Sequence, residues 1–169
     1  MKNLLLTFLM FVTLSTFSQS STWIPVVIEE GKDMEYLAFE KNWMSINKAL
    51  IDAGYRTGWS VWKRTPKDGD DGWAQYYVVV GNNDDKQLSQ EEWAPFMQKA
   101  LGKSQRAISK MMDGSGIIAE ARPLQISWVG GTVYAGSSIK PGDKMYFHYM
   151  TQQNENFEEL ELNVWQPIA

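Results

Sequence analysis

Residues 35–50 of the chain are EYLAFEKNWMSINKAL, and this stretch decides the fold. Its large apolar side chains follow one another at intervals of three and four residues, which places them on one face of an α-helix. They are Tyr36, Phe39, Trp43, Ile46 and Leu50. Asp33 is a residue type that caps helices, and Gly54 stands where a left-handed residue often ends one. The sequence therefore predicts a helix from Asp33 to about Ala53.

Strands are predicted on both sides of this helix. Residues 22–30 carry β-branched side chains in their middle and predict a strand, in which Pro25 favours an edge or a bulge because it lacks an N–H. Residues 57–64 and 73–80 flank a stretch of turn-forming residues, 66–72. Together they predict an antiparallel hairpin.

A second helix is predicted from Ser89 to Met112. Ser89 and Glu92 have the spacing of a capping box, and Gly102 marks a point where the helix can bend. Residues 124–129 then alternate as a strand does.

The predicted order of elements between residues 22 and 130 is strand, helix, strand, strand, helix, strand. This order indicates an α+β, ferredoxin-like split βαβ fold with an antiparallel sheet. Helices then cover one face of the sheet only, so the other face needs a partner sheet, a ligand or water.

The C-terminal stretch repeats the start of the fold in a weaker form. A predicted strand at 144–152 precedes Phe157 and Trp165 in a Glu-rich context similar to that of Tyr36 and Trp43. We therefore expect a ferredoxin-like unit at 19–131, followed at 132–169 by the start of a second, incomplete unit.

Residues 1–18 show the three parts of a secretory signal peptide, which are Lys2, an apolar run at 4–12 and a small polar exit. The apolar run is shorter than the ~20 residues that a membrane-spanning helix needs. We expect cleavage after Ser18 and export by a bacterium to the periplasm or the medium, with no membrane attachment afterwards. The chain contains no Cys, so disulfides, thiol-linked lipids and thiolate metal sites are excluded.

The composition argues against two classes of partner. The net charge is −4 at pH 7 and no basic run occurs, which makes nucleic acid and anionic membranes poor partners. Aromatic residues make up 13% of the chain and include eight Trp, enough for a core and for a pocket or an interface as well.

His148 is the only histidine of the chain and is the first candidate for chemistry. Beside Tyr146 it could act as a base or ligate haem iron; a hydrogen-bonded histidine on a strand is the other interpretation. A zinc site with two histidines is impossible, and the acidic loop at 68–72 lacks the register of a calcium-binding loop. We predict no metal and no cofactor.

Four aromatic residues of the predicted hairpin are candidates for an apolar ligand pocket: Trp59, Trp62, Tyr76 and Tyr77. Packing against the helices or against a second copy is an equally good interpretation of each ring. Because side chains alternate along a strand, only one of Trp59 and Trp62 can face the open side of the sheet.

The chain resembles the dimeric α/β-barrel superfamily, above all its poorly characterised exported bacterial members. The resemblance rests on the order of elements, on Glu35, Tyr36, Leu37, Glu40 and Trp43 in the first helix, and on the strand Gly58-Trp59-Ser60-Val61-Trp62. It covers about residues 22–130 and implies that two copies pair their sheets into a barrel. Cofactor-free monooxygenases, small isomerases and haem-binding branches all belong to this superfamily.

Three hypotheses follow. The first is a non-catalytic exported homodimer that binds a small apolar or aromatic ligand or acts as an interaction module. The second is a cofactor-independent monooxygenase or isomerase that uses His148 and a Tyr for proton transfer. The third is haem binding through His148. Replacing His148 by Ala separates them.

Overall fold

The structure is a computed structural model, and it describes residues 20–66, 69, 72–127, 140–145, 156 and 159. The chain divides into two compact units, residues 1–127 and 128–169. The predicted signal peptide, the candidates Tyr146 and His148, and nearly all of the predicted elements after residue 143 lie outside the described residues. In the second unit the described residues include a turn in which the Lys140 N–H donates to Asp143 Oδ2 at 2.7 Å.

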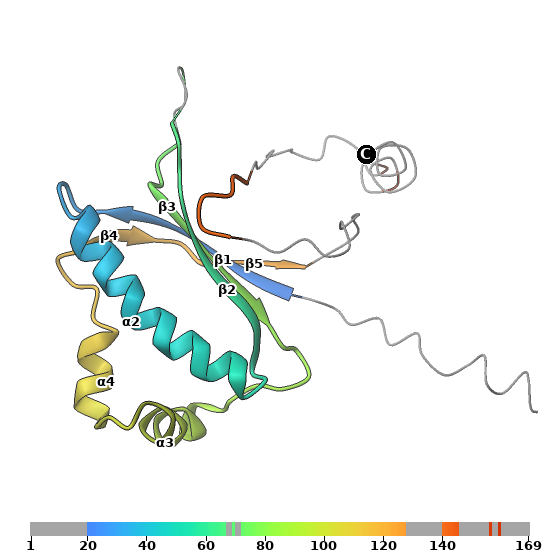
Figure 1. Cartoon of the computed structure of the whole chain (residues 1–169). Helices are drawn as coiled ribbons and strands as arrows, with labels where there is room; N and C mark the ends of the chain where they lie inside the picture. The colour runs from blue at the N-terminus through green and yellow to red at the C-terminus, as the bar shows by residue number, and fades with distance from the viewer. Residues whose placement is uncertain are drawn as a thin grey trace, which may run out of the picture. The chain divides into compact units, whose positions relative to one another are not determined.

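The first unit is an α+β, ferredoxin-like fold, as predicted (Figure 1). Its sheet is antiparallel and has the strand order β2-β3-β1-β4, with β5 also paired to β1. The elements are β1 (Ser20–Ile28), α2 (Asp33–Asp52), β2 (Arg56–Lys63), β3 (Tyr76–Asn82), α3 (Gln90–Leu101), α4 (Gln105–Met111), β4 (Ile118–Ala121) and β5 (Leu124–Ser127). Among the described helices, none is long and apolar enough to cross a membrane.

Helix α2 has the predicted apolar face but a different start. Lys32 occupies the cap position and makes no side-chain capping bond, whereas Asp33 is the first helical residue. The prediction of Asp33 as the cap is therefore wrong, because its carboxylate is taken by side chains of the sheet. At the other end Gly54 has φ +77° and follows the last turn, as expected of a left-handed terminator.

The predicted second helix is two helices. Gly102 adopts a left-handed conformation with φ 61° and ends α3, and the Ser104 hydroxyl then accepts from the Ala107 N–H to cap α4. The predicted capping box of Ser89 and Glu92 is present at the start of α3. The continuous helix was a wrong prediction because the apolar spacing carries on through a glycine that ends the helix instead of bending it.

Pro25 lies in β1, an interior strand, and not at an edge. Its carbonyl accepts from the Arg122 N–H at 3.2 Å. In an antiparallel strand the N–H and C=O of one residue point to the same neighbour, so the N–H that Pro25 lacks would also point toward the break between β4 and β5. Pro123 lies in the same break. The missing N–H therefore costs no hydrogen bond of the ladder.

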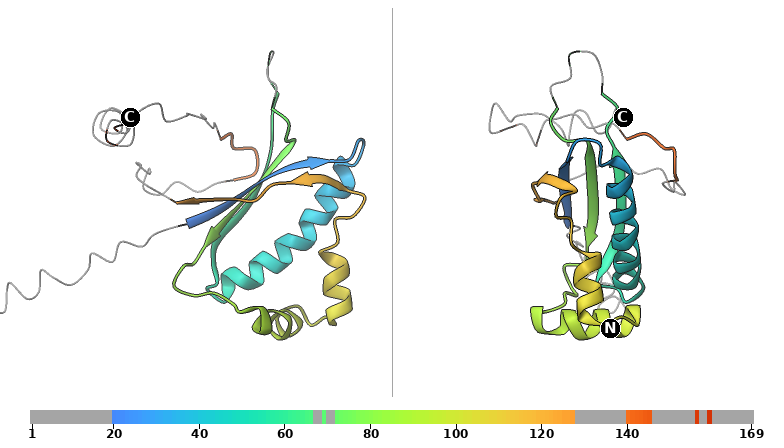
Figure 2. Two further views of the ribbon diagram at one scale, coloured as in Figure 1. Left: turned by 180° about the vertical axis from the view of Figure 1, so that it is seen from behind. Right: turned by 90° about the vertical axis from the view of Figure 1, so that its left-hand side faces the viewer.

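The helices cover one face of the sheet (Figures 1 and 2). One buried cluster joins that face to α2, and a second joins α2 to α3 and α4. The first consists of Val26, Ile28, Tyr36, Phe39, Tyr76, Val78 and Val80. The second consists of Ile46, Leu50, Met97 and Ile108. The core thus leaves two features of the sheet for function: its other face, and the part of the helix-side face that lies beyond the end of α2.

Candidate functional site

A pocket of 340 Å³ lies where the C-terminal end of α2, the start of β2 and the ends of β3 and β5 meet. Its walls are polar with one aromatic ring. They are formed by Ser20, Tyr55, Arg56, Asn82, Asn83, Asp84, Gln87 and Gln125. This volume is near the lower end of the range of roughly 300–1,000 Å³ that is usual for small-molecule sites.

The back wall of the pocket is a hydrogen-bonded cluster of side chains across three strands. The Asn82 amide donates to Thr22 Oγ1 at 3.2 Å and to Gln125 Oε1 at 3.5 Å. The Gln125 amide donates in turn to Thr22 Oγ1 at 2.9 Å. Thr22 faces Val80 across β1 and β3, so the apolar face of the sheet becomes polar beyond the helix. The bonds fix both amides in place.

Arg56 supplies the positive charge of the pocket. Its Nη1 donates to Asn47 Oδ1, and Asn47, fully buried on α2, donates through Nδ2 to the Trp43 carbonyl at 2.8 Å. The Trp43 bond fixes which end of the Asn47 amide faces Arg56. Burial lowers the pKa of Arg56, yet a guanidinium stays charged in proteins. Within the described part of the chain no carboxylate forms an ion pair with it.

Asp84 supplies the negative charge at the rim. Its two oxygens accept from Ser20, from the backbone N–H at 3.2 Å and from the hydroxyl at 2.5 Å. Beside it, Asn83 donates to the Gly54 carbonyl at 2.7 Å and so ties the rim to the end of α2. Gln87 makes no hydrogen bond to any other residue that the structure describes, which leaves its amide available to a ligand.

The second candidate surface is the face of the sheet opposite the helices. The strand register arranges its residues in rows: Trp62, Tyr77 and Pro25 in one, and Ser60, Val79, Trp23 and Leu124 in the next. A third row holds Gly58, Gly81, Ser21 and Ile126. Leu124 is 50% exposed and Ile126 is 37% exposed. Each of the four strands thus contributes at least one large apolar or aromatic side chain to this helix-free face, among which lie Ser21, Ser60 and two glycines.

The four aromatic residues of the predicted pocket do not lie together. Tyr76 is 1% exposed in the core, and Trp59 packs against the same cluster below α2. Trp62 and Tyr77 are direct cross-strand neighbours on the helix-free face. The ligand-binding prediction therefore concerns Trp62 and Tyr77, while Trp59 and Tyr76 hold the sheet to its helix.

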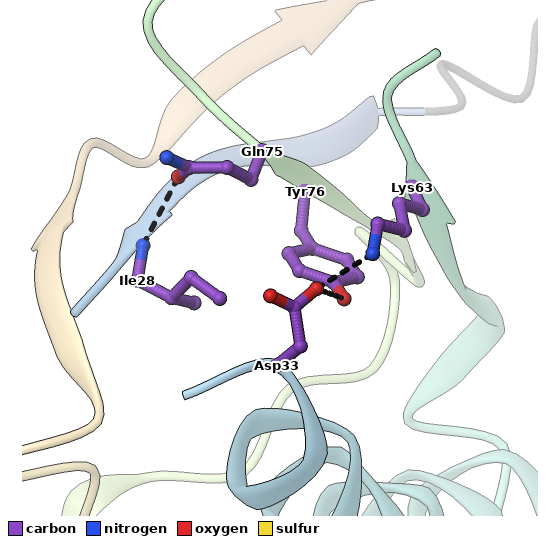
Figure 3. A network of polar contacts seen from close by, with 5 residues as sticks. All are labelled: Ile28, Asp33, Lys63, Gln75 and Tyr76. Atoms are coloured by element: carbon purple, nitrogen blue, oxygen red, sulfur yellow. Dashed lines mark hydrogen bonds and ion pairs between the residues drawn. The ribbon is translucent and has the colours of Figure 1, made fainter. Parts of the chain in front are cut away.

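A polar clamp holds the far end of the sheet to α2 (Figure 3). Asp33 Oδ1 accepts from Lys63 Nζ at 2.6 Å and from the Tyr76 hydroxyl at 2.7 Å. Lys63 lowers the pKa of Asp33, and Tyr76 lowers it further. Burial and Asp33 raise the pKa of Tyr76, so its phenol stays protonated and donating at neutral pH. The clamp is suited to structure and not to proton transfer.

Glu40 is an acid buried on α2, 7% exposed. Burial raises its pKa, and the nearby Tyr36 hydroxyl acts in the opposite direction. Burial raises the pKa of Tyr36 as well, and nearby Glu40 raises it further. Neither residue lines the pocket at the end of α2. Both belong to the buried interior of the first unit.

The polar pocket was not predicted from the sequence. Its residues come from four stretches, at 20, 55–56, 82–87 and 125, which are individually ordinary and far apart in the chain. One signal was present: Asn47 interrupts the apolar face of the amphipathic helix α2, nine residues before Arg56. In the described part of the chain no group of three or more His, Asp or Glu could hold a metal ion.

No protein-family model and no curated protein sequence matches the chain. Solved structures do match it. The NE2512 protein of unknown function from Nitrosomonas europaea is 13% identical with a TM-score of 0.43, over 71% of this chain and 98% of that one. PA3566 from Pseudomonas aeruginosa is 5% identical with a TM-score of 0.45, over 67% and 96%.

A dimeric ferredoxin-like protein of unknown function from Thermobifida fusca YX is 9% identical, with a TM-score of 0.39, over 69% of this chain and 97% of that one. At these levels the likeness concerns the fold alone. The chain has a ferredoxin-like fold. What it binds has to be argued from its own residues.

Proposed function

We propose that the protein is an exported, non-catalytic binding protein that works as a homodimer, with the helix-free faces of two sheets packed together around a small apolar or aromatic ligand. The proposal rests on one observation, the composition of that face. A sheet with one wet face alternates apolar and polar side chains. Here four outward positions of β1 and β3 carry large apolar or aromatic side chains, Trp23, Val27, Tyr77 and Val79, where a wet face carries polar ones. Polar residues on the same face include Ser21 and, opposite Val27 on β4, Glu120.

The size of the face supports a second copy as the occupant. Four strands spaced about 4.8 Å apart and about seven residues long have a plan area on the order of 500 Å². Standard interfaces bury about 800 Å² on each partner, which side chains projecting from such a sheet can supply. A symmetric pair also needs no other gene product, because the same apolar patch serves both sides.

The chemistry of the face supports binding and not catalysis. The rows of Trp62 and of Ser60 contain no acid and no histidine. Trp62 Nε1 and the Ser60 hydroxyl are hydrogen-bonded to each other at 2.8 Å, and the other polar side-chain groups of these rows are the Tyr77 hydroxyl and Trp23 Nε1. The rest of those rows consists of rings and aliphatic groups, which stabilise an apolar or aromatic ligand by contact. The monooxygenase, isomerase and haem alternatives depend on His148, which lies outside the described residues.

The test is the mass of the native protein, measured by light scattering and by native mass spectrometry on material from the export compartment. We expect a dimer of a chain that begins at Gln19. Leu124→Glu and Ile126→Glu place charges on the helix-free face and should give monomers. Met34→Glu, on the outer side of α2 at 75% exposed, is the matched control and should stay dimeric.

A wild-type monomer at tens of micromolar, or dimers that are indifferent to both substitutions, would refute the dimer. An intact residue 1–18 segment on the exported chain would refute the predicted cleavage. Extra mass on the native dimer that disappears on denaturation would identify the ligand class directly.

A further inference from the structure

We infer that the polar pocket at the end of α2 binds a small organic monocarboxylate, with the carboxylate of the ligand paired to the Arg56 guanidinium. This site is separate from the proposed dimer face. Asn82 and Thr22 belong to the helix side of the sheet, whereas Trp62 and Tyr77 belong to the other side. Binding here is therefore measured independently of the oligomeric state.

The first argument is the unneutralised charge of Arg56. A guanidinium has five N–H donors in a planar fork that fits a carboxylate with two parallel bonds. One donor goes to Asn47, whose amide is neutral, so the positive charge is positioned without being cancelled. A buried helix residue that orients an arginine toward a pocket is the arrangement expected of a binding site.

The second argument is what surrounds the guanidinium. Asn82 and Gln125 are fixed by their mutual hydrogen bond, and the Gln87 amide, in the loop between β3 and α3, adds a donor. Tyr55 contributes a ring, held edge-on by Phe96 at 5.3 Å between centroids and covered by Lys86 at 4.4 Å. The pocket thus offers a rigid aromatic wall beside a charged anchor, which suits a carboxylate with a compact organic body.

The third argument concerns the charge of the ligand. Asp84 lines the same pocket, and although Ser20 occupies its two oxygens, its negative charge remains. Arg56 and the Lys86 ammonium over the Tyr55 ring, opposed by Asp84, leave a single excess positive charge around the pocket, which favours a monoanion over a phosphate dianion. A ligand that also carries an amino group could place it toward Asp84, so amino acids belong in the probe set.

The experiment is a calorimetric titration of the dimer or monomer, as isolated, with acetate, benzoate and glycine, and with benzamide and inorganic phosphate as contrasts. Carboxylate binding with weak or no response to benzamide and phosphate supports the site. Arg56→Gln should weaken the best carboxylate about ten-fold or more, since a charge-assisted bidentate pair is lost. Lys99→Gln, the same charge change on the exposed surface of α3, should leave affinity unchanged.

Arg56→Lys keeps the charge but loses the fork, and we expect intermediate affinity. It also protects the test against misfolding of Arg56→Gln, as does a circular dichroism spectrum of each variant. The inference is overturned if no monocarboxylate binds at concentrations up to about 10 mM, which is ten times the ~1 mM Kd of a weak specific ligand. Equal affinity in wild type and in both Arg56 variants overturns it as well.

Discussion

The Tyr76 hydroxyl donates a 2.7 Å hydrogen bond to Asp33 Oδ1 and thereby ties the first residue of β3 to the first residue of α2. The ring of Tyr76 lies 4.5 Å from that of Tyr36, its neighbour in the core. The phenol is therefore apolar at one end and polar at the other, and it joins the core to the clamp. This contact holds the N-terminal end of α2 to the sheet, and the pocket lies beyond the C-terminal end of the same helix.

Tyr76→Phe removes the hydroxyl and keeps the ring. We expect a loss of about 1 kcal/mol in the free energy of unfolding, the usual value of one hydrogen bond, measured by urea denaturation. Tyr55→Phe is the control, because the Tyr55 hydroxyl makes no hydrogen bond with any described residue. A Tyr76→Phe protein as stable as the wild type would show that the clamp contributes nothing.

Asp33→Asn tests the acid dependence of the same clamp. Lys63 and Tyr76 lower the pKa of Asp33 in the folded chain, below its usual value of about 4. The ionised clamp therefore adds stability above that usual value and loses it as the pH falls through the lowered pKa. Melting temperatures from pH 2.5 to 7 should differ between wild type and variant above about pH 4 and converge at the acid end.

The control for Asp33→Asn is Asp52→Asn, which breaks an exposed ion pair with Lys48. Such surface pairs contribute little, so its melting curve should follow the wild type at every pH. A constant difference between Asp33→Asn and wild type down to pH 2.5 would contradict the role of ionisation.

Glu40→Gln is expected to stabilise the protein at neutral pH. Burial raises the pKa of Glu40 in the folded state, so its cost to stability is absent below the unfolded pKa and grows as the pH rises toward and through the folded one. The neutral amide removes this cost. Unfolding of both proteins at pH 4 and pH 8 provides the comparison: equal stability at pH 4 and a more stable variant at pH 8. A variant that is less stable at pH 8 would mean that the carboxylate has a partner it needs.

The fold could be predicted because its signals are local. The apolar spacing of α2, the capping box of Ser89 and the turn between β2 and β3 each act within a few residues. The break at Gly102 was missed because a glycine gives the same spacing pattern whether it bends a helix or ends it. The position of Pro25 was missed because it depends on the break between β4 and β5, where the N–H of Arg122, almost a hundred positions away, donates to the Pro25 carbonyl.

The site could not be predicted in the same way. Arg56, Asn82 and Gln125 carry no motif. They come together only because β2 pairs with β3 and β1 pairs with both β3 and β5. The aromatic residues were candidates because of their residue type. The alternation of side chains along the strands, however, places Trp59 and Tyr76 in the core. Aromatic content therefore indicated packing more than chemistry, whereas Asn47, one of two buried polar residues of α2, marked the pocket.

Gly81→Ala tests the bulge that places Arg56 at the pocket. The register of β2 against β3 slips between Arg56 and Gly58, which leaves Thr57 as the extra residue. A Cβ on Gly81 would lie 2.3 Å from Thr57 Oγ1 and 3.0 Å from the Gly58 nitrogen, so backbone must move. We expect Gly81→Ala to destabilise the protein by more than the ~1 kcal/mol that a strained but uncrowded glycine position costs.

Gly102→Ala is such an uncrowded position, with φ +61° and no atom within 4 Å of the added Cβ, and it serves as the reference. Adding Thr57→Ala to Gly81→Ala removes the shorter of the two close contacts and should recover part of the lost stability. The coupling of the two substitutions in a double-mutant cycle then measures the crowding itself. If the free-energy changes of the two substitutions simply add, the bulge already relaxes around the Cβ at position 81 without the second substitution. Carboxylate binding by Gly81→Ala should then be unchanged.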